Sequence, residues 1–231
     1  MYYSRQTILF LSLVFLCSSC CSSYIPRAVY APSFTKSNEF DSEIKVGTGG
    51  NTVQLGYAIT DNIAITSGAQ FIERDRLTVG DSCFHKQKFF DINPGYYYSN
   101  DQGLRMSIYA GVGFGSTINK FRDTQNSDIK TINNDYAQFM IQPSIGFSSN
   151  FAEISLTLRT SIVNYGKDRE ASSVFGSEES VAYFDPALTL KLGGKNVKVV
   201  NQIGLTVPIG EIDIKSVLFP LTYNLGLNIR L

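Results

Sequence analysis

The 231-residue chain has no tryptophan, a single histidine and no net charge, because twenty basic residues balance twenty acidic ones. Balanced charge argues against binding to nucleic acid, which takes an excess of basic residues. One histidine cannot build a metal cluster, and the four cysteines show no zinc-ligand spacing. No interior segment approaches the roughly 18 consecutive apolar residues of a membrane-spanning helix. A chain of this kind enters a membrane only as a barrel.

Catalytic signatures are missing as well. The one histidine, His85, lies in a polar stretch and is predicted to be a solvated loop residue. The Gly-x-Ser-x-Gly nucleophile motif is absent. Residues 111–117 (GVGFGST) lack the lysine and the following helix of a phosphate loop. We therefore expect a protein that is not an enzyme and has no catalytic residue, bound metal or cofactor.

The first 20 residues have the layout of a secretory signal. Arg5 supplies the basic region, residues 8–16 are apolar, and small residues follow. This layout predicts export. The stretch Cys17-Ser18-Ser19-Cys20 resembles the cleavage box of bacterial lipoproteins, which implies lipidation of Cys20, although such boxes usually carry leucine at the place of Cys17. Cleavage without a lipid is the alternative.

The chain after the signal divides into two parts. Residues 21–40 contain Pro26 and Pro32 and show no periodicity, so they are predicted to be a periplasmic linker or a plug-like segment. Residues 41–231 alternate between polar and apolar positions up to the last residue. A lipoprotein-like signal, then Cys-Ser-Ser-Tyr-Ile-Pro (residues 21–26), then an alternating domain resembles small outer-membrane β-barrel lipoproteins of Bacteroidota-type bacteria. The resemblance implies a location in the bacterial outer membrane and no catalytic residues.

Period-two alternation predicts ten strands. They span residues 41–48, 52–60, 63–73, 87–98, 103–115, 135–148, 151–163, 182–192, 196–208 and 217–231. Most have the length that a tilted strand needs to cross a bilayer. The predicted fold class is all-β, an up-and-down antiparallel transmembrane β-barrel of ten strands. Eight strands are the alternative, if the first two are not part of the barrel.

The predicted connections alternate in length. Short ones fall at residues 61–62, 99–102, 150 and 193–195, and longer polar ones at 74–86, 116–134, 164–181 and 209–216. In a meander this gathers the short turns at one end and the long loops at the other, as in outer-membrane barrels with periplasmic turns and external loops. An even strand number then predicts that an anchor at Cys20 and the terminal Leu231 share the periplasmic side.

The face of the strands that meets lipid is predicted from composition. A secreted soluble barrel also alternates, with its apolar residues inward. Here the non-apolar face is mostly Gly, Ser, Thr, Gln, Asn and Tyr rather than Lys and Glu, which suits an enclosed polar lumen. Aromatic residues gather near both ends of the apolar band, as in the interfacial girdles of membrane barrels. They are Tyr57, Tyr96, Tyr98, Phe147 and Phe151 near the short turns, and Phe71, Phe90, Phe114, Phe139, Phe184 and Phe219 near the long loops.

Charges on the inner face need partners, because a narrow barrel leaves little room for hydration. Register arithmetic places Arg159 opposite Asp185 across one strand pair. Closure between the first and last strands brings Arg230 to Glu43. The predicted polar network of the lumen consists of Arg159, Asp185, Glu43, Arg230, Asp91 and Tyr109.

The last residues, LTYNLGLNIRL, alternate up to Leu231 and are predicted to be the closing strand. This ending resembles the C-terminal assembly signal of outer-membrane barrels, so the expected partners are outer-membrane lipids and the barrel-assembly machinery. The sequence indicates no external ligand. The predicted function is a non-enzymatic outer-membrane barrel with a structural or surface-interaction role. A narrow, porin-like pore for small solutes and a secreted soluble ligand-binding barrel are the alternatives.

Overall fold

The computed structural model describes residues 25–78, 81–122, 129–165, 180–209 and 221–231, and it is an antiparallel β-barrel. No helix long and apolar enough to cross a membrane occurs among these residues. The strands are β1 (Phe40–Gly47), β2 (Gly50–Ala58), β3 (Ile63–Thr78), β4 (Asp81–Ser99), β5 (Leu104–Arg122), β6 (Ile129–Ser148), β7 (Ala152–Tyr165), β8 (Ser180–Gly193), β9 (Val197–Leu205), β10 (Val207–Ile209) and β11 (Leu221–Arg230).

The barrel closes between the first and the last strand. Strands β1 to β8 pair in chain order, β8 pairs with β9, β9 with β11, and β11 with β1. Strand β10 continues β9 along β8 after a break at Thr206, so the two form one strand of the wall and the barrel has ten. Two hydrogen bonds between Phe40 and Leu231, of 2.9 and 3.1 Å, complete the seam. The ten strands therefore pair in a closed ring.

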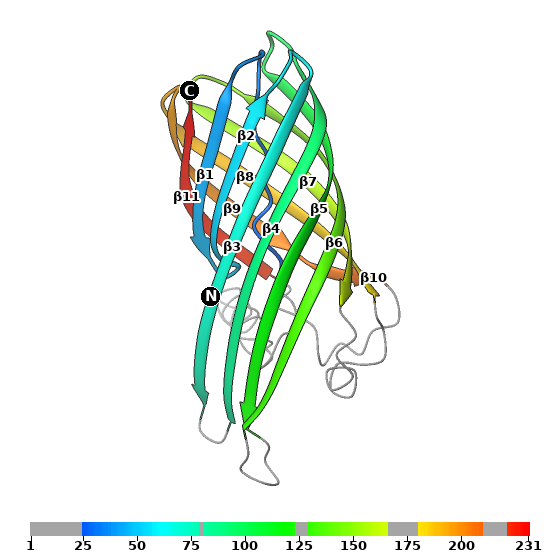
Figure 1. The fold of residues 1–231 in the computed structure, drawn as a ribbon. Helices are drawn as coiled ribbons and strands as arrows, with labels where there is room; N and C mark the ends of the chain where they lie inside the picture. Colours follow the sequence, from blue (N-terminus) through cyan, green and yellow to red (C-terminus); the bar gives the residue numbers. More distant parts are fainter. Residues whose placement is uncertain (1–24, 79–80, 123–128, 166–179, 210–220) are drawn as a thin grey trace, which may run out of the picture.

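The short turns lie at one end of the barrel, together with the C-terminal residue Leu231 (Figure 1). They follow β2, β4, β6 and β8, at residues 59–62, 100–103, 149–151 and 194–196. Gly103 has a φ of +90° in one of these turns, a left-handed conformation that glycine adopts without strain. We call this end the short-turn end and the opposite end the long-loop end.

At the long-loop end the structure corrects two predicted connections. Residues 74–86 and 116–134 were expected to be loops, but β3 and β4 remain paired out to Thr78 and Asp81, and β5 and β6 out to Arg122 and Ile129. The alternation of polar and apolar residues did not identify these parts of the strands, because a sheet outside a membrane has no side that must be apolar to face lipid. Strands β3 to β6 therefore project beyond the rest of the wall as a four-stranded extension (Figure 1).

Residues 25–34 run through the inside of the barrel (Figure 1), and every one of them whose side chain is apolar is buried. Residues 25–34, which belong to the stretch predicted as a periplasmic linker or a plug-like segment, thus occupy the lumen. We call residues 25–34 the plug segment.

Candidate functional site

The two faces of the barrel wall differ in chemistry because successive strand residues point to opposite sides. Outward positions carry large apolar side chains that are exposed, such as Leu156 at 44% and Phe114 at 64%. Inward positions carry polar side chains that are buried. These include Lys45, Thr52, Gln54, Gln70, Gln87, Asp91, Gln142, Glu153, Thr157, Arg159, Asp185, Thr189, Lys191, Lys198, Gln202 and Asn228. An apolar exterior around a polar interior is the pattern of a wall that faces lipid.

Both predicted aromatic girdles lie on the exterior where the structure describes them. Near the short turns the exposed aromatic residues are Tyr57, Tyr96, Tyr98, Phe147 and Phe151, and toward the long-loop end they are Phe71, Phe90, Phe114 and Phe139. Phe184 is half-buried, and Phe219 lies outside the described residues. Beyond the second girdle the exposed outward positions of the extension include charged residues, namely Glu73, Asp75 and Lys120, beside the apolar Ile129. The change from aromatic to charged residues marks where the wall leaves the apolar layer.

Buried ion pairs fill the half of the lumen near the short turns. Glu43 contacts both Lys45 and Lys191 at 2.5 Å. Glu153 accepts from Lys198 at 2.6 Å and from Arg230 at 3.0 Å. Because each carboxylate has at least two cationic neighbours, the charges compensate one another where little water can enter.

The plug segment is held by side chains of the wall that bind its backbone. Its carbonyl oxygens accept from long side chains on β1, β2, β4, β6, β7, β8 and β9. The bonds are Gln87 to Ile25 (2.9 Å), Arg159 to Arg27 (2.8 Å), Gln54 to Ala28 (2.7 Å), Lys45 and Gln202 to Val29 (2.6 and 2.9 Å), Gln142 to Tyr30 (2.7 Å) and Lys191 to Ala31 (2.9 Å). An extended segment has no internal hydrogen bonds, so the wall supplies partners for these buried carbonyls. The donors surround the segment on all sides.

Gln87 and Gln202 each bind the plug segment twice. Gln87 donates to the carbonyl of Ile25 and accepts from its amide at 3.1 Å, and Gln202 does the same with Val29, at 2.9 and 3.0 Å. A primary amide side chain matches a peptide group because it carries one donor and one acceptor side by side. These two glutamines thus bind the plug backbone as a neighbouring strand would.

Side chains of the plug segment also pair with the wall. Arg27 forms an ion pair with Asp91 and lies over the ring of Phe89, with 5.6 Å from its guanidinium carbon to the ring centre. The Tyr30 hydroxyl donates to Asp41 at 2.8 Å. Near the short turns, Phe34 packs on Tyr97 with 5.5 Å between ring centres. The segment is therefore fixed along its length.

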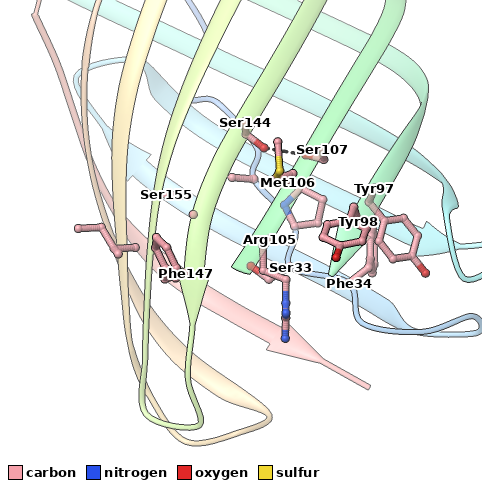
Figure 2. A pocket seen from close by; sticks show the side chains of 14 residues that line it. Ser33, Phe34, Tyr97, Tyr98, Arg105, Met106, Ser107, Ser144, Phe147 and Ser155 are labelled. Carbon is pink, nitrogen blue, oxygen red and sulfur yellow. Dashed lines mark hydrogen bonds between the residues drawn. The ribbon is translucent and has the colours of Figure 1, made fainter. Parts of the chain in front are cut away.

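Little space remains between the plug and the wall near the short turns. Ser33 and Phe34 face Tyr97, Arg105 and Ser107 there (Figure 2), and the cavity among these residues measures about 20 Å³. A volume of that size holds about one water molecule. Among these residues the plug packs closely against the wall.

Each predicted lumen residue can now be placed. Arg159 lies directly opposite Asp185, and its Nε donates to Oδ2 at 3.0 Å. Asp91 binds the plug residue Arg27 rather than another wall charge. Tyr109 packs with Phe34, Ala58, Ala64 and Tyr97 in a small apolar cluster. The predicted lipidation site, Cys20, lies outside the described residues.

The predicted contact between Arg230 and Glu43 is wrong. Asp41 is the residue opposite Arg230, and Glu43 is opposite Asn228. Arg230 contacts Asp41 at 3.3 Å and Glu153 at 3.0 Å. The register of β1 on β11 differs by two residues from the expected one. Both side chains therefore still point inward, but each lies opposite another residue.

The predicted solvated position of His85 is also wrong. His85 is buried on the inner face of the extension, where its Nδ1 lies 2.6 Å from Oδ1 of Asn119. Burial lowers the pKa of this imidazole, and the hydrogen bond to Asn119 opposes the shift. The error follows from reading residues 74–86 as a loop.

The residues that hold the plug were not predicted as a site. Lys45, Gln54, Gln87, Gln142 and Gln202 fall on inward positions of strands that the alternation identified. The signal in the sequence was the residue type. Long side chains with hydrogen-bond donors recur at the lumen positions, whereas short polar side chains would be enough to line a water-filled interior. The partner segment could not be inferred from that signal alone.

Comparisons with known proteins identify no family for the chain, but they find similar solved structures of bacterial barrel proteins. No family model matches the chain, and no curated protein matches it in sequence. Among solved structures it is similar to the N-terminal β-barrel domain of Pseudomonas aeruginosa OprF, with 11% identity over 85% of this chain and 99% of that one and a TM-score of 0.34. The translocator domain of the autotransporter NalP from Neisseria meningitidis matches with 10% identity over 84% and 86% and a TM-score of 0.44. A major outer membrane protein from Thermus thermophilus matches with 14% identity over 84% and 99% and a TM-score of 0.38.

Proposed function

We propose that this protein is a non-enzymatic β-barrel of the bacterial outer membrane, with its lumen closed by its own plug segment and a structural or surface-interaction role. The plugged lumen carries the proposal. Its inward side chains bind the plug backbone and one another, so their hydrogen-bonding capacity is directed to internal partners. A solute-binding or conducting interior needs polar groups that face water.

The two alternative functions are less well supported. A narrow pore needs a continuous water path, and the plug segment occupies the lumen from Ile25 to Phe34. A soluble ligand-binding barrel would turn its apolar residues inward, whereas here Ile44, Leu156, Ile203 and Leu227 are among the exposed ones. An apolar belt of this extent requires a lipid or protein covering.

The surface role is assigned to the extension formed by β3 to β6. Its exposed outward side chains include the charged residues Glu73, Asp75 and Lys120, and it projects beyond the girdle that contains Phe71 and Phe90 (Figure 1). A rigid sheet offers a fixed surface for contacts outside the membrane at little cost in conformational entropy. The external partner is left unspecified, because no group on this face selects a ligand class.

Five further features of the protein are proposed from its sequence. They are export by the signal over residues 1–20, lipidation of Cys20, a Bacteroidota-type origin, contact with outer-membrane lipids and recognition of the closing strand β11 by the barrel-assembly machinery. The closed seam between β1 and β11 supports the last of these, because closure of the barrel requires the terminal strand.

Two measurements test the proposal. Cell fractionation should recover the protein in the outer membrane and not in the aqueous phase without detergent. In planar bilayers the full chain should give no stable openings, and a variant lacking residues 25–34 should conduct if it assembles. Stable openings of the full chain would favour the pore. Recovery of the protein as a soluble species would favour the ligand-binding barrel.

A further inference from the structure

The direction in which the plug segment runs has a consequence for the chain that precedes it. At its C-terminal end the segment reaches the short turns, where Ser99 donates to the carbonyl of Thr35 at 3.2 Å and the amide of Ser37 donates to Asp61 at 2.8 Å. The chain then turns into β1 at Phe40, beside Leu231. The plug therefore joins the barrel at the short-turn end.

Its other end lies toward the long loops. The carbonyl of Ile25 accepts from Gln87 on β4 and from Gln70 on β3, at 2.9 and 3.4 Å. Gln70 also donates to the carbonyl of Gly49, in the β1–β2 turn at the long-loop end, at 2.6 Å. Gln70 precedes Phe71, so Ile25 lies at the height of the second aromatic girdle. The plug thus spans the wall from one girdle to the other.

Connectivity limits where the preceding residues can lie. Ten residues separate Ile25 from Thr35 and span about 33 Å when extended, which exceeds the roughly 25 Å apolar height of outer-membrane barrels. Cys20 is five residues before Ile25, so it lies within about 18 Å of it. A return to the short-turn end would exceed this reach and would need a second passage through a lumen that already contains the plug.

We propose that the chain leaves the barrel through the long-loop mouth, so that the residues before Ile25, Cys20 included, lie on the cell-surface side of the membrane. The proposal rests on the outer-membrane location in the proposed function. It reverses the side expected from strand parity, which placed Cys20 and Leu231 together. Parity describes the strands alone, and the plug adds one further crossing. A lipid on Cys20 would then enter the outer leaflet beside the girdle that contains Phe71 and Phe90.

Epitope insertion tests the side on which the N-terminal residues lie. A short tag is inserted after Ser23, and a matched tag after Gly194 in the short turn between β8 and β9. In intact cells the antibody should bind the first tag and reach the second only after permeabilisation. Binding to the first tag only after permeabilisation, in cells whose barrel is assembled in the outer membrane, overturns the inference and leaves the proposed function standing.

A smaller change guards against a tag that disturbs assembly. Ser23→Cys and Lys195→Cys are made separately in a Cys21→Ser, Cys83→Ser background and exposed to a membrane-impermeant maleimide, with the background alone as the blank. At least tenfold more labelling at position 23 than at position 195 in intact cells is expected. Equal protection of both positions contradicts the inference. Absence of both variants from the outer-membrane fraction contradicts the proposed function and the inference with it.

The lipid is tested separately. Labelled palmitate should enter the natural chain and not the Cys20→Ala variant, while a tag after Ser23 stays accessible in both. Loss of surface access in Cys20→Ala would overturn the inference, because the side on which the N-terminal residues lie would then depend on the lipid and not on the course of the plug.

Discussion

At the scale of single residues, the lumen relies on charges that are fully removed from water. Arg159 and Asp185 form the clearest pair, with 2% and 3% of their surfaces exposed, and Arg159 also binds the plug carbonyl of Arg27. Removing one partner leaves the other charge buried and uncompensated, which lowers the stability strongly. Replacing both partners with apolar residues of similar volume is often neutral or stabilising. The pair therefore fixes the position of the plug more than it adds stability.

Replacing Arg159 alone should be strongly destabilising. Arg159→Met leaves the Asp185 carboxylate buried without its guanidinium partner, and the free energy of unfolding should fall by about 3 to 5 kcal/mol. The double variant Arg159→Met/Asp185→Leu should recover part of that loss. Urea unfolding in lipid vesicles measures both. As a control, Lys86→Met breaks the exposed pair with Glu73, at 2.9 Å, and should cost no more than about 1 kcal/mol. Equal effects of the buried and exposed substitutions would contradict the expected role of burial.

His85 allows a pH prediction, because it lies in the extension, beyond the aromatic girdle, and is the one histidine of the chain. Its pKa in the folded protein is lowered by burial, while the unfolded value is about 6.5. The stability that the neutral imidazole contributes is therefore complete above about pH 6.5 and is lost as the pH falls through the lowered folded pKa. An NMR titration should give a single imidazole with a pKa below that of the urea-unfolded chain. A folded pKa at or above the unfolded one would refute the buried position.

At the scale of elements, the plug segment and the strands are matched in detail. Inward glycines leave room for the plug where its side chains come close to the wall. A Cβ atom on Gly56 would lie 2.9 Å from both the Tyr30 hydroxyl and the Phe34 ring, and one on Gly68 would overlap the Arg27 guanidinium. The partner that packs against these glycines is the plug, which is distant from them in the sequence.

Filling one of these spaces should weaken the barrel. Gly68→Val places a side chain where Arg27 meets Asp91, and overpacking of this kind costs about 1 to 3 kcal/mol. Ala69→Val, one residue along on the lipid side, is the matched control and should change stability by less than about 0.5 kcal/mol. Urea midpoints of the two variants in vesicles give the comparison. A neutral Gly68→Val would mean that Arg27 does not occupy this position.

At the scale of the whole molecule, the barrel is inverted relative to a soluble protein, with charges inside and large apolar side chains outside. On the described strands, the exposed charged side chains lie in the extension. This division predicts that the same kind of substitution destabilises the protein at one place on the outer surface and is tolerated at another, because the first place faces lipid and the second faces water.

Lysine substitutions test the division directly. Leu156 lies about midway between the girdle residue Phe151 and Ile162, which pairs with the girdle residue Phe139. Leu156→Lys should therefore lower the free energy of unfolding in vesicles by about 2 to 4 kcal/mol. Asn133→Lys, on the exposed face of the extension, should be nearly neutral. A soluble barrel would tolerate both lysines equally, so similar effects at the two positions would count against a membrane-embedded wall.

The sequence alone determined the strands, their order and the two faces of the wall, because a period of two follows from strand geometry wherever one face meets lipid. It also placed Arg159 opposite Asp185, since pairing about a turn fixes local register. Only the tertiary structure decided the contents of the lumen and the extension. The plug segment has no periodicity, and its contacts join Val29 to Gln202 across 173 positions of the chain. The strands of the extension lack the continuous lipid-facing apolar side whose alternation with polar residues identified the other strands. Closure set the partners of Glu43 and Arg230, because a two-residue displacement at the seam leaves every inward residue inward.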